Sequence, residues 1–116
     1  MAIEKIDVWD FRPPFRDGPF AMAHATSSHV YGRILRFQDS DGYSGIGEIV
    51  FPPYIAEADR EQRIGDEQSY LMPLIGESFN TLLDVASEAR SRDKSWRSIA
   101  FALETAWFDR EGHRTK

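Results

Sequence analysis

The chain contains no cysteine, which excludes disulfide bonds and thiol catalysis and fits a reducing cytoplasm. It also lacks an excess of positive charge: 14 Lys and Arg stand against 19 Asp and Glu, for a formal net charge of -5. Such a chain has no general attraction for nucleic-acid phosphates. Its longest apolar runs are far too short to span a bilayer, and its N-terminus does not resemble a signal peptide. We therefore expect a cytoplasmic protein that binds neither nucleic acid nor membrane.

Lysine and histidine, which often act as bases or metal ligands, are scarce. They are Lys5, Lys94, Lys116, His24, His29 and His113. The histidines are widely separated, and none belongs to an HExxH or similar ligand pattern. We therefore expect no metal site and no catalytic residue within this chain.

The first part of the chain is typical of a strand, because β-branched and aromatic residues alternate with aspartates over residues 6–11. The phase is imperfect: Ile6 and Val8 fall on one face, and Trp9 and Phe11 on the other. This strand should therefore either bulge or be covered on both sides. The next stretch, Phe15 to Ser28, has neither helical nor strand periodicity and is expected to be a long loop of the kind that is usually functional or disordered.

A β-hairpin is predicted next. The β-rich run from His29 to Phe37 is followed by the turn sequence Asp39-Ser40-Asp41-Gly42 and by a second run that ends at Val50. Gly45 and Gly47 would weaken an ordinary strand, so another part of the chain is expected to pack closely against this backbone.

The second half has helical spacing. In a first helix over residues 56–72, closed by Pro73 and Gly76, the expected buried face consists of Ile64, Gln68, Leu71, Met72 and Ile75. A second helix is predicted from an N-cap at Ser78 to about Arg90, and its apolar stripe is Phe79, Leu82, Leu83, Ala86 and Ala89. Strands followed by helices in a chain of 116 residues indicate one α+β domain.

A third and stronger helix should begin near Asp93 or Ser95 and end near Gly112. Its apolar residues at helical spacing are Trp96, Ile99, Ala100, Leu103, Ala106 and Trp107.

Several conspicuous side chains are interpreted as structural. Glu48 is expected to anchor the hairpin to neighbouring backbone or to another domain. Glu104 and Asp109 lie on different faces of the third helix, so they are interpreted as hydrogen-bonding or interdomain anchors and not as an acid–base pair. Trp96 and Trp107 are expected to be core or interface anchors.

Three segments carry motifs that occur together in one family. They are the opening IEKIDVWDFRPPF, the hairpin DSDGYSGIGE with its Gly-x-Gly-Glu sequence, and the helix SWRSIAFALETAWFDREGH. In order and spacing they resemble the first strand, hairpin and last helix of the capping domain of the mandelate racemase and muconate lactonizing enzymes, in the enolase superfamily. Arg110 and Glu111 replace that family's more usual apolar-then-basic pair. The resemblance covers residues 1–116 and implies a three-stranded antiparallel meander followed by a three-helix bundle.

In that family the capping domain selects the substrate and covers a TIM-like barrel, which holds Mg²⁺ and a Lys or His base that removes a proton α to a carboxylate. The chain has no Lys-x-Lys motif, and no run of barrel strands follows Lys116. The resemblance therefore implies that the barrel, with its Mg²⁺, is a partner missing from this chain, which alone should be inactive. It further implies a small carboxylate substrate and a homo-oligomer.

By position, the segment Phe15 to Ser28 matches the family's specificity loop, and Phe51 to Tyr54 matches a second loop near the pocket. The residues expected to contact or enclose a substrate are Phe20, Met22, Thr26 and Tyr54. The alternative is that these side chains only pack the loops against their own domain.

Two functions stay open. The chain is either the cap of a racemase, epimerase, cycloisomerase or acid-sugar dehydratase, or a free-standing binding or oligomerisation module derived from such a cap. A cap without its barrel would expose apolar surface, with Phe101, Trp107 and Phe108 as expected contributors. Alternatively, Phe101 and Phe108 pack against the hairpin.

Overall fold

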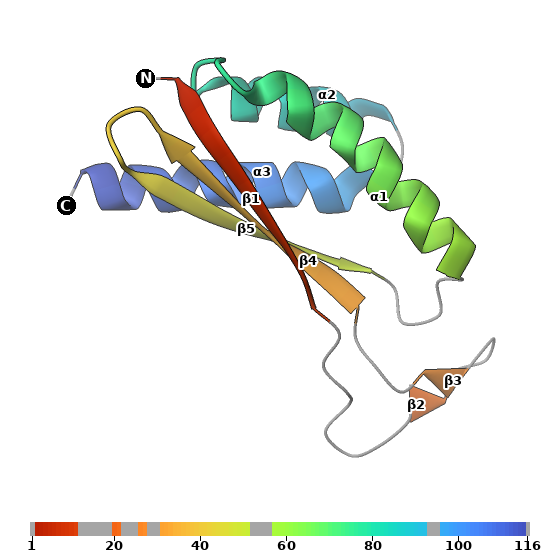
Figure 1. Cartoon of the computed structure of the whole chain (residues 1–116). Coiled ribbons are helices and arrows are strands. Elements are labelled where there is room, and N and C mark those ends of the chain that lie inside the picture. Colours follow the sequence, from red (N-terminus) through yellow and green to blue (C-terminus); the bar gives the residue numbers. More distant parts are fainter. Residues whose placement is uncertain are drawn as a thin grey trace.

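The computed structural model of the chain describes residues 2–11, 20–21, 26–27, 31–51, 57–92 and 96–115, and for residues 11, 20, 21, 26, 27 and 31 it describes the backbone only. A three-stranded antiparallel sheet comes first and three helices follow (Figure 1). The strands, in their order across the sheet, are β1 (Ile3–Phe11), β4 (Tyr31–Asp39) and β5 (Ser44–Phe51). The helices are α1 (Glu57–Leu71), the 3₁₀ turn η1 (Met72–Leu74), α2 (Thr81–Arg92) and α3 (Arg97–Arg114). The predicted α+β class and order of elements are confirmed.

Strand β1 contains an irregularity, but not where it was predicted. Its register against β4 shifts between Ile3 and Lys5, whereas residues 6–11 pair regularly, with Ile6 opposite Phe37 on the side of the core. Trp9 points to the other side and is 46% exposed, so this part of the strand is not covered on both faces either.

The expectation of a loop throughout Phe15 to Ser28 was wrong. This segment contains a short antiparallel ladder of β2 (Phe20–Ala21) and β3 (Thr26–Ser27), in which Phe20 lies opposite Ser27. In Figure 1 the ladder lies apart from the helices, beyond the ends of β1 and β4. Two-residue strands are too short for an alternating pattern to reveal them in the sequence.

The core lies between the helices and one face of the sheet. Alternate residues of β4 and β5 point toward the helices, and Leu35, Phe37 and Ile49 among them are fully buried. They meet the predicted apolar stripes of α2 and α3, in which Leu82 and Leu103 are likewise fully buried. The opposite face of the sheet carries Ile46 and Val50, each 47% exposed.

Helix α1 buries a different face from the predicted one. Three side chains expected in the core are exposed: Gln68, Met72 and Ile75. Glu67, Leu71 and Leu74 are buried instead, with Ile64 packed against the core. The prediction was wrong because helical periodicity places a glutamate on the solvent-facing side of a helix. Glu67 is buried instead, where it accepts a hydrogen bond from Arg33.

The helix ends differ from the predicted positions. Helix α2 begins at Thr81, after a turn in which the Thr81 N–H donates to the Ser78 carbonyl oxygen at 2.9 Å. Helix α3 continues past Gly112 to Arg114, and its N-cap position is Trp96. The predicted caps Asp93 and Ser95 lie outside the described residues.

Candidate functional site

Both segments expected to contact a substrate leave the sheet at the same end. Phe11 lies opposite Gly32, and Tyr31 lies opposite Phe51, so the end of β1, the start of β4 and the end of β5 are adjacent. Residues 12–30 connect the end of β1 to the start of β4. Residues 52–56 follow the end of β5, which lies beside the start of β4. We call this the loop end of the sheet, and it is the candidate functional site (Figure 1).

Two of the four predicted substrate contacts can be placed. Phe20 lies in β2 and Thr26 in β3, on the ladder beyond the loop end. Met22 and Tyr54 lie outside the described residues. That these four side chains contact a substrate stays a prediction.

A surface groove of about 470 Å³ lies between β5 and the start of α3, near the loop end. It is lined by Glu48, Val50, Arg97, Ser98 and Phe101. Glu48 is exposed there, so its expected role as an anchor stays a prediction.

A buried ion pair lies just inside the loop end. Arg33 of β4 is 3% exposed, and its Nη1 donates a hydrogen bond to Oε2 of Glu67 in α1 at 3.3 Å. Its Nε lies 3.3 Å from Oδ1 of Asp10, which is opposite Arg33 on β1. Side chains from three elements thus meet where the predicted substrate segments begin.

Burial raises the pKa of Glu67 from 4.5 to about 7, because desolvation disfavours the carboxylate. The positive charges of Arg33 and Arg63 act in the opposite direction without offsetting the burial. Glu67 therefore titrates near neutral pH.

We expect the free energy of unfolding to fall as the pH rises from about 4.5 to about 7, relative to a Glu67→Gln variant. Between these values the folded chain holds a proton on Glu67 that the unfolded chain has released, so a rise in pH favours unfolding. A shift of this size corresponds to about 3 kcal/mol. Urea denaturation at several pH values measures the difference. The exposed Glu61→Gln variant should follow the wild type, and parallel profiles for wild type and Glu67→Gln would contradict the prediction.

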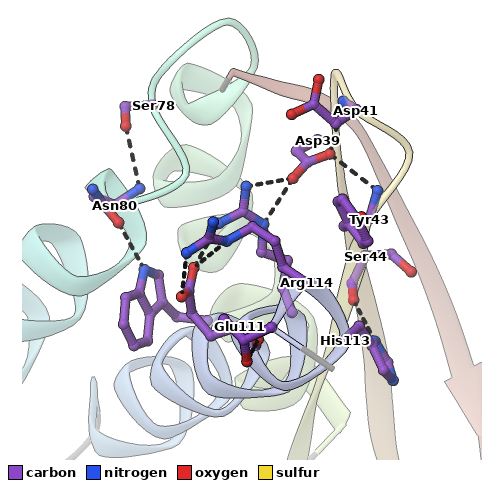
Figure 2. A network of polar contacts seen from close by, with 12 residues as sticks. Asp39, Asp41, Tyr43, Ser44, Ser78, Asn80, Glu111, His113 and Arg114 are labelled. Carbon is purple, nitrogen blue, oxygen red and sulfur yellow. Dashed lines mark hydrogen bonds and ion pairs between the residues drawn. The ribbon is translucent and has the colours of Figure 1, made fainter.

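At the other end of the sheet, Asp39 connects the hairpin turn to the last turns of α3 (Figure 2). Its Oδ1 accepts hydrogen bonds from the backbone N–H groups of Asp41 at 2.8 Å and Tyr43 at 3.0 Å. Its Oδ2 accepts from Arg110, through Nε at 2.7 Å and through Nη2. Burial alone would raise the pKa of Asp39, but the hydrogen bonds from Arg110 and the turn outweigh it and lower that pKa.

Helix α3 lies directly on the backbone of β5, because two glycines leave no side chain between them. A Cβ atom on Gly47 would lie 2.0 Å from the carbonyl oxygen of Ala102, and one on Gly45 would lie 1.8 Å from that of Ala106. The predicted close approach to the Gly-x-Gly backbone is confirmed.

The acidic residues of α3 are hydrogen-bonding anchors, as predicted. Asp109 accepts a hydrogen bond from the Ile46 N–H at 2.9 Å and so holds β5. Glu104 forms an ion pair with Arg90 at 3.0 Å and so holds α2. The two carboxylates contact different elements and do not form an acid–base pair.

The two tryptophans of the third helical segment are core anchors. Trp96 packs on the ring of Tyr70 with centroids 5.0 Å apart, and Trp107 Nε1 donates to Asn80 Oδ1 at 3.0 Å. Both indoles are partly buried against the core.

The burial of four charged residues was not predicted from the sequence: Arg33, Asp39, Glu67 and Arg110. A signal was available for two of them. Arg33 lies two residues before Leu35 in the strand alternation, and Arg110 lies four residues after Ala106 on the apolar face of its helix. A charge at a core position of a regular pattern indicates a buried partner.

Among the residues that the structure describes, no group of three or more His, Cys, Asp or Glu side chains could hold a metal ion. His113 Nδ1 lies 3.0 Å from the Ser44 carbonyl oxygen, whereas His24 and His29 lie outside the described residues. None of the described helices is long and apolar enough to cross a membrane.

Comparison with known proteins finds no matching family model and no matching curated protein, but solved structures share the fold. The N-succinyl Arg/Lys racemase from Bacillus cereus matches with a TM-score of 0.77 and 22% identity, over 99% of this chain and 31% of its own. A dipeptide epimerase from Cytophaga hutchinsonii, complexed with Mg and the dipeptide D-Ala-L-Val, matches with a TM-score of 0.78 and 18% identity, over 99% and 31%. A mandelate racemase/muconate lactonizing protein from Herpetosiphon aurantiacus matches with a TM-score of 0.70 and 21% identity, over 98% and 32%.

These likenesses show the class of fold: an α+β domain of three antiparallel strands followed by three helices. The same fold forms part of solved structures described as a mandelate racemase/muconate lactonizing protein, a dipeptide epimerase and an N-succinyl Arg/Lys racemase. The chain spans about a third of the length of the structures it matches.

Proposed function

We propose that this chain is the capping and substrate-specificity domain of a Mg²⁺-dependent enolase-superfamily enzyme. The reaction class is racemisation or epimerisation, cycloisomerisation or acid-sugar dehydration, each through removal of a proton α to a carboxylate. The observation that carries the proposal is the fold likeness over 99% of this chain to 31% of a racemase and of a dipeptide epimerase. The proposed enzyme is cytoplasmic and homo-oligomeric, and it acts on a small carboxylate.

The geometry of the loop end supports this division of labour. Segments 12–30 and 52–56 are joined to adjacent strand ends, so both can reach one substrate, and the sheet fixes the points where they begin. A Mg²⁺ ion held by the barrel would supply positive charge beside the substrate carboxylate; none of the described residues of this chain would hold it. The part proposed for this chain is to enclose the substrate and exclude water, with Phe20, Met22, Thr26 and Tyr54 as the candidate contacts.

We expect the isolated chain to be inactive and a form that includes the downstream barrel to be active with Mg²⁺. The assay is exchange of the α proton for deuterium in D₂O, followed by mass spectrometry, on dipeptides, N-succinyl amino acids, acid sugars and α-hydroxy acids. In the active form, Phe20→Ala and Thr26→Ala should change the ranking of substrates by kcat/KM while exchange persists. Exchange by the isolated chain, or a coding sequence that does not continue into a barrel after Lys116, would contradict the proposal.

One observation keeps a second candidate open, a free-standing oligomerisation module. Phe101 and Phe108 are 59% and 65% exposed, as expected for contributors to an apolar surface, so the alternative that they pack against the hairpin does not hold. They are seven residues apart and share one stripe of α3. The barrel would cover such a surface in the first candidate, and a second copy would cover it in the other.

We expect the isolated chain to self-associate through this stripe, because burial of apolar surface contributes roughly 25 cal/mol per Å². Sedimentation velocity over a wide concentration range measures it. The double variant Phe101→Ser/Phe108→Ser should shift the chain toward monomer, whereas Met72→Ser, exposed elsewhere, should not. A monomer that persists at high concentration would remove the second candidate.

A further inference from the structure

A mixed apolar and charged surface runs along β5 and α3. Its exposed side chains are Ile46, Glu48 and Val50 of β5 and Arg97, Phe101 and Phe108 of α3. Most of them line the groove of about 470 Å³ between these two elements. Beyond the groove, the Ile46 N–H donates to Asp109, the residue after Phe108, at 2.9 Å. The side chains therefore belong to one continuous surface, which we call the β5–α3 face.

The apolar part of this face is large enough for the core of a dimer interface. A buried aromatic side chain covers about 150–250 Å². Phe101 and Phe108 are 59% and 65% exposed, so together they present roughly 200–300 Å² to solvent. Ile46 and Val50, each 47% exposed, enlarge this area. Each partner in a stable interface buries about 800 Å², of which somewhat more than half is apolar. These side chains thus supply most of the apolar area that a second copy needs to cover.

The β5–α3 face also carries one acid and one base that have no ion-pair partner within the described part of the chain. Glu48 and Arg97 line the same groove, but they do not pair with each other or with another described residue. By contrast, Glu104 on the same helix is occupied by Arg90 at 3.0 Å. An available acid and an available base therefore lie together on one apolar surface.

This combination fits a second copy of the chain better than a partner of different sequence. An isologous interface joins the same surface of two copies across a two-fold axis. When the axis passes between the two charged side chains, Glu48 of each copy lies beside Arg97 of the other, so the same pairing occurs twice and both charges are compensated. A different partner would need its own acid and base at matching positions. Two-fold symmetry supplies both groups without a further requirement.

We propose that the β5–α3 face is an isologous dimer interface of this chain, with its apolar side chains as the core and two reciprocal Glu48–Arg97 pairs at the rim. This inference rests on the proposed self-association and adds to it the interface, its symmetry and its charge pairing. Exposed ion pairs contribute little affinity, but they select the partner and its orientation, because like charges in the same place repel. Charge reversal therefore tests the interface without removing its apolar core.

The first experiment measures the Kd of the dimer by sedimentation velocity at low ionic strength, where exposed charges are least screened. Glu48→Arg and Arg97→Glu should each raise Kd at least tenfold, because each places like charges together twice. The two substitutions change the formal net charge of -5 in opposite directions, so a general charge effect does not give the same result in both. The combined variant Glu48→Arg/Arg97→Glu exchanges the two charges and should return Kd to within threefold of the wild type. A wild-type Kd in both single variants would overturn the inference.

The second experiment mixes the two single variants in equal amounts. In a dimer of one Glu48→Arg copy and one Arg97→Glu copy, the introduced arginine faces the introduced glutamate, and the native Glu48 faces the native Arg97. The mixture should therefore form a heterodimer with a Kd within threefold of the wild type, although each variant alone associates weakly. This rescue requires a two-fold interface between copies, because a face that binds a different partner gains nothing from the mixture. A mixture that stays monomeric while the wild type dimerises would overturn the inference.

Controls separate the interface from folding and from the proposed function. Glu61→Arg, at an exposed position of α1, makes the same change of charge as Glu48→Arg and should leave Kd unchanged. An equal rise of Kd in Glu61→Arg would overturn a specific role for Glu48. Glu48 and Arg97 are exposed, so their variants should keep the wild-type urea midpoint; if one single variant does not fold, the other and the combined variant still decide the question. A wild-type chain that stays monomeric would overturn this interface and the second candidate together, whereas the deuterium-exchange assay decides the role as a cap.

Discussion

Replacing Gly47 with alanine should destabilise the chain by about 3 kcal/mol or more, because the new methyl group collides with helix α3. Its Cβ would lie 2.0 Å from the carbonyl oxygen of Ala102, where separations under 3.0 Å are essentially never found. The obstacle is helix backbone, which cannot rotate away as a side chain can. The helix must therefore move off the sheet and loosen the core beneath it. Urea denaturation measures the loss as a lower midpoint.

A glycine in open space provides the matched control for this substitution. Gly65 lies within α1, and a Cβ there would meet nothing within 4 Å. Gly65→Ala should therefore raise the free energy of unfolding by up to about 1 kcal/mol, from the higher helix propensity of alanine. Equal stability of Gly47→Ala and wild type would contradict the close packing of α3 on β5.

Replacing Arg110 with methionine should cost about 3–5 kcal/mol, because it leaves the buried carboxylate of Asp39 without its cation. Asp39 is 0% exposed and Arg110 is 3% exposed. The turn N–H groups of Asp41 and Tyr43 would still donate to the carboxylate, but the charge itself would be uncompensated. The guanidinium also lies 4.6 Å from the centroid of the Phe79 ring, so α3 would lose a contact with the turn that precedes α2.

The same substitution at an exposed pair is the control. Arg90→Met removes the ion pair with Glu104, whose side chains are 50% and 32% exposed, and should cost only about 0.2–1 kcal/mol. The double variant Arg110→Met/Asp39→Asn should recover part of the loss, because no buried charge remains. If Arg110→Met costs no more than Arg90→Met, the buried pair does not hold α3.

The pH dependence of the free energy of unfolding gives an independent test of the buried Asp39–Arg110 pair. The pKa of Asp39 is lowered below its ordinary 3.8, so its contribution is complete above that value and is lost as the pH falls through the folded-state pKa. The stability difference between wild type and Arg110→Met should therefore persist at neutral pH and shrink in strong acid. This is a different pH range from that of Glu67, so the two pairs can be distinguished in one set of denaturation curves.

Part of the candidate site follows from sequence order. Consecutive antiparallel strands bring the end of one strand beside the start of the next, so the segments after Phe11 and after Phe51 could be expected near one another. The ladder at Phe20 and Thr26 could not, because its strands are only two residues long. The buried contact between Arg33 and Glu67 could not either, since the two residues are 34 positions apart along the chain.

The sequence by itself determined the features that depend on residues close together along the chain. The Asp39 to Gly42 turn needs only its own four residues, and Gly42 has the positive φ of 91° that favours glycine. The Gly-x-Gly spacing within a strand indicated a close backbone approach without identifying α3. The apolar stripes of α2 and α3 likewise follow from helical periodicity.

What only the tertiary structure decided is which charged residues are buried. Desolvation makes a lone charge in a core unfavourable, so periodicity assigns every Arg and Glu to the surface. A partner reverses that assignment, and for Arg110 the partner is Asp39, 71 residues away. For α1 the buried face includes Glu67 and not Gln68, because Glu67 accepts a hydrogen bond from the buried Arg33 of the sheet. The local sequence pattern cannot contain this information, because the attraction between the two charges arises only when the folded chain brings them together.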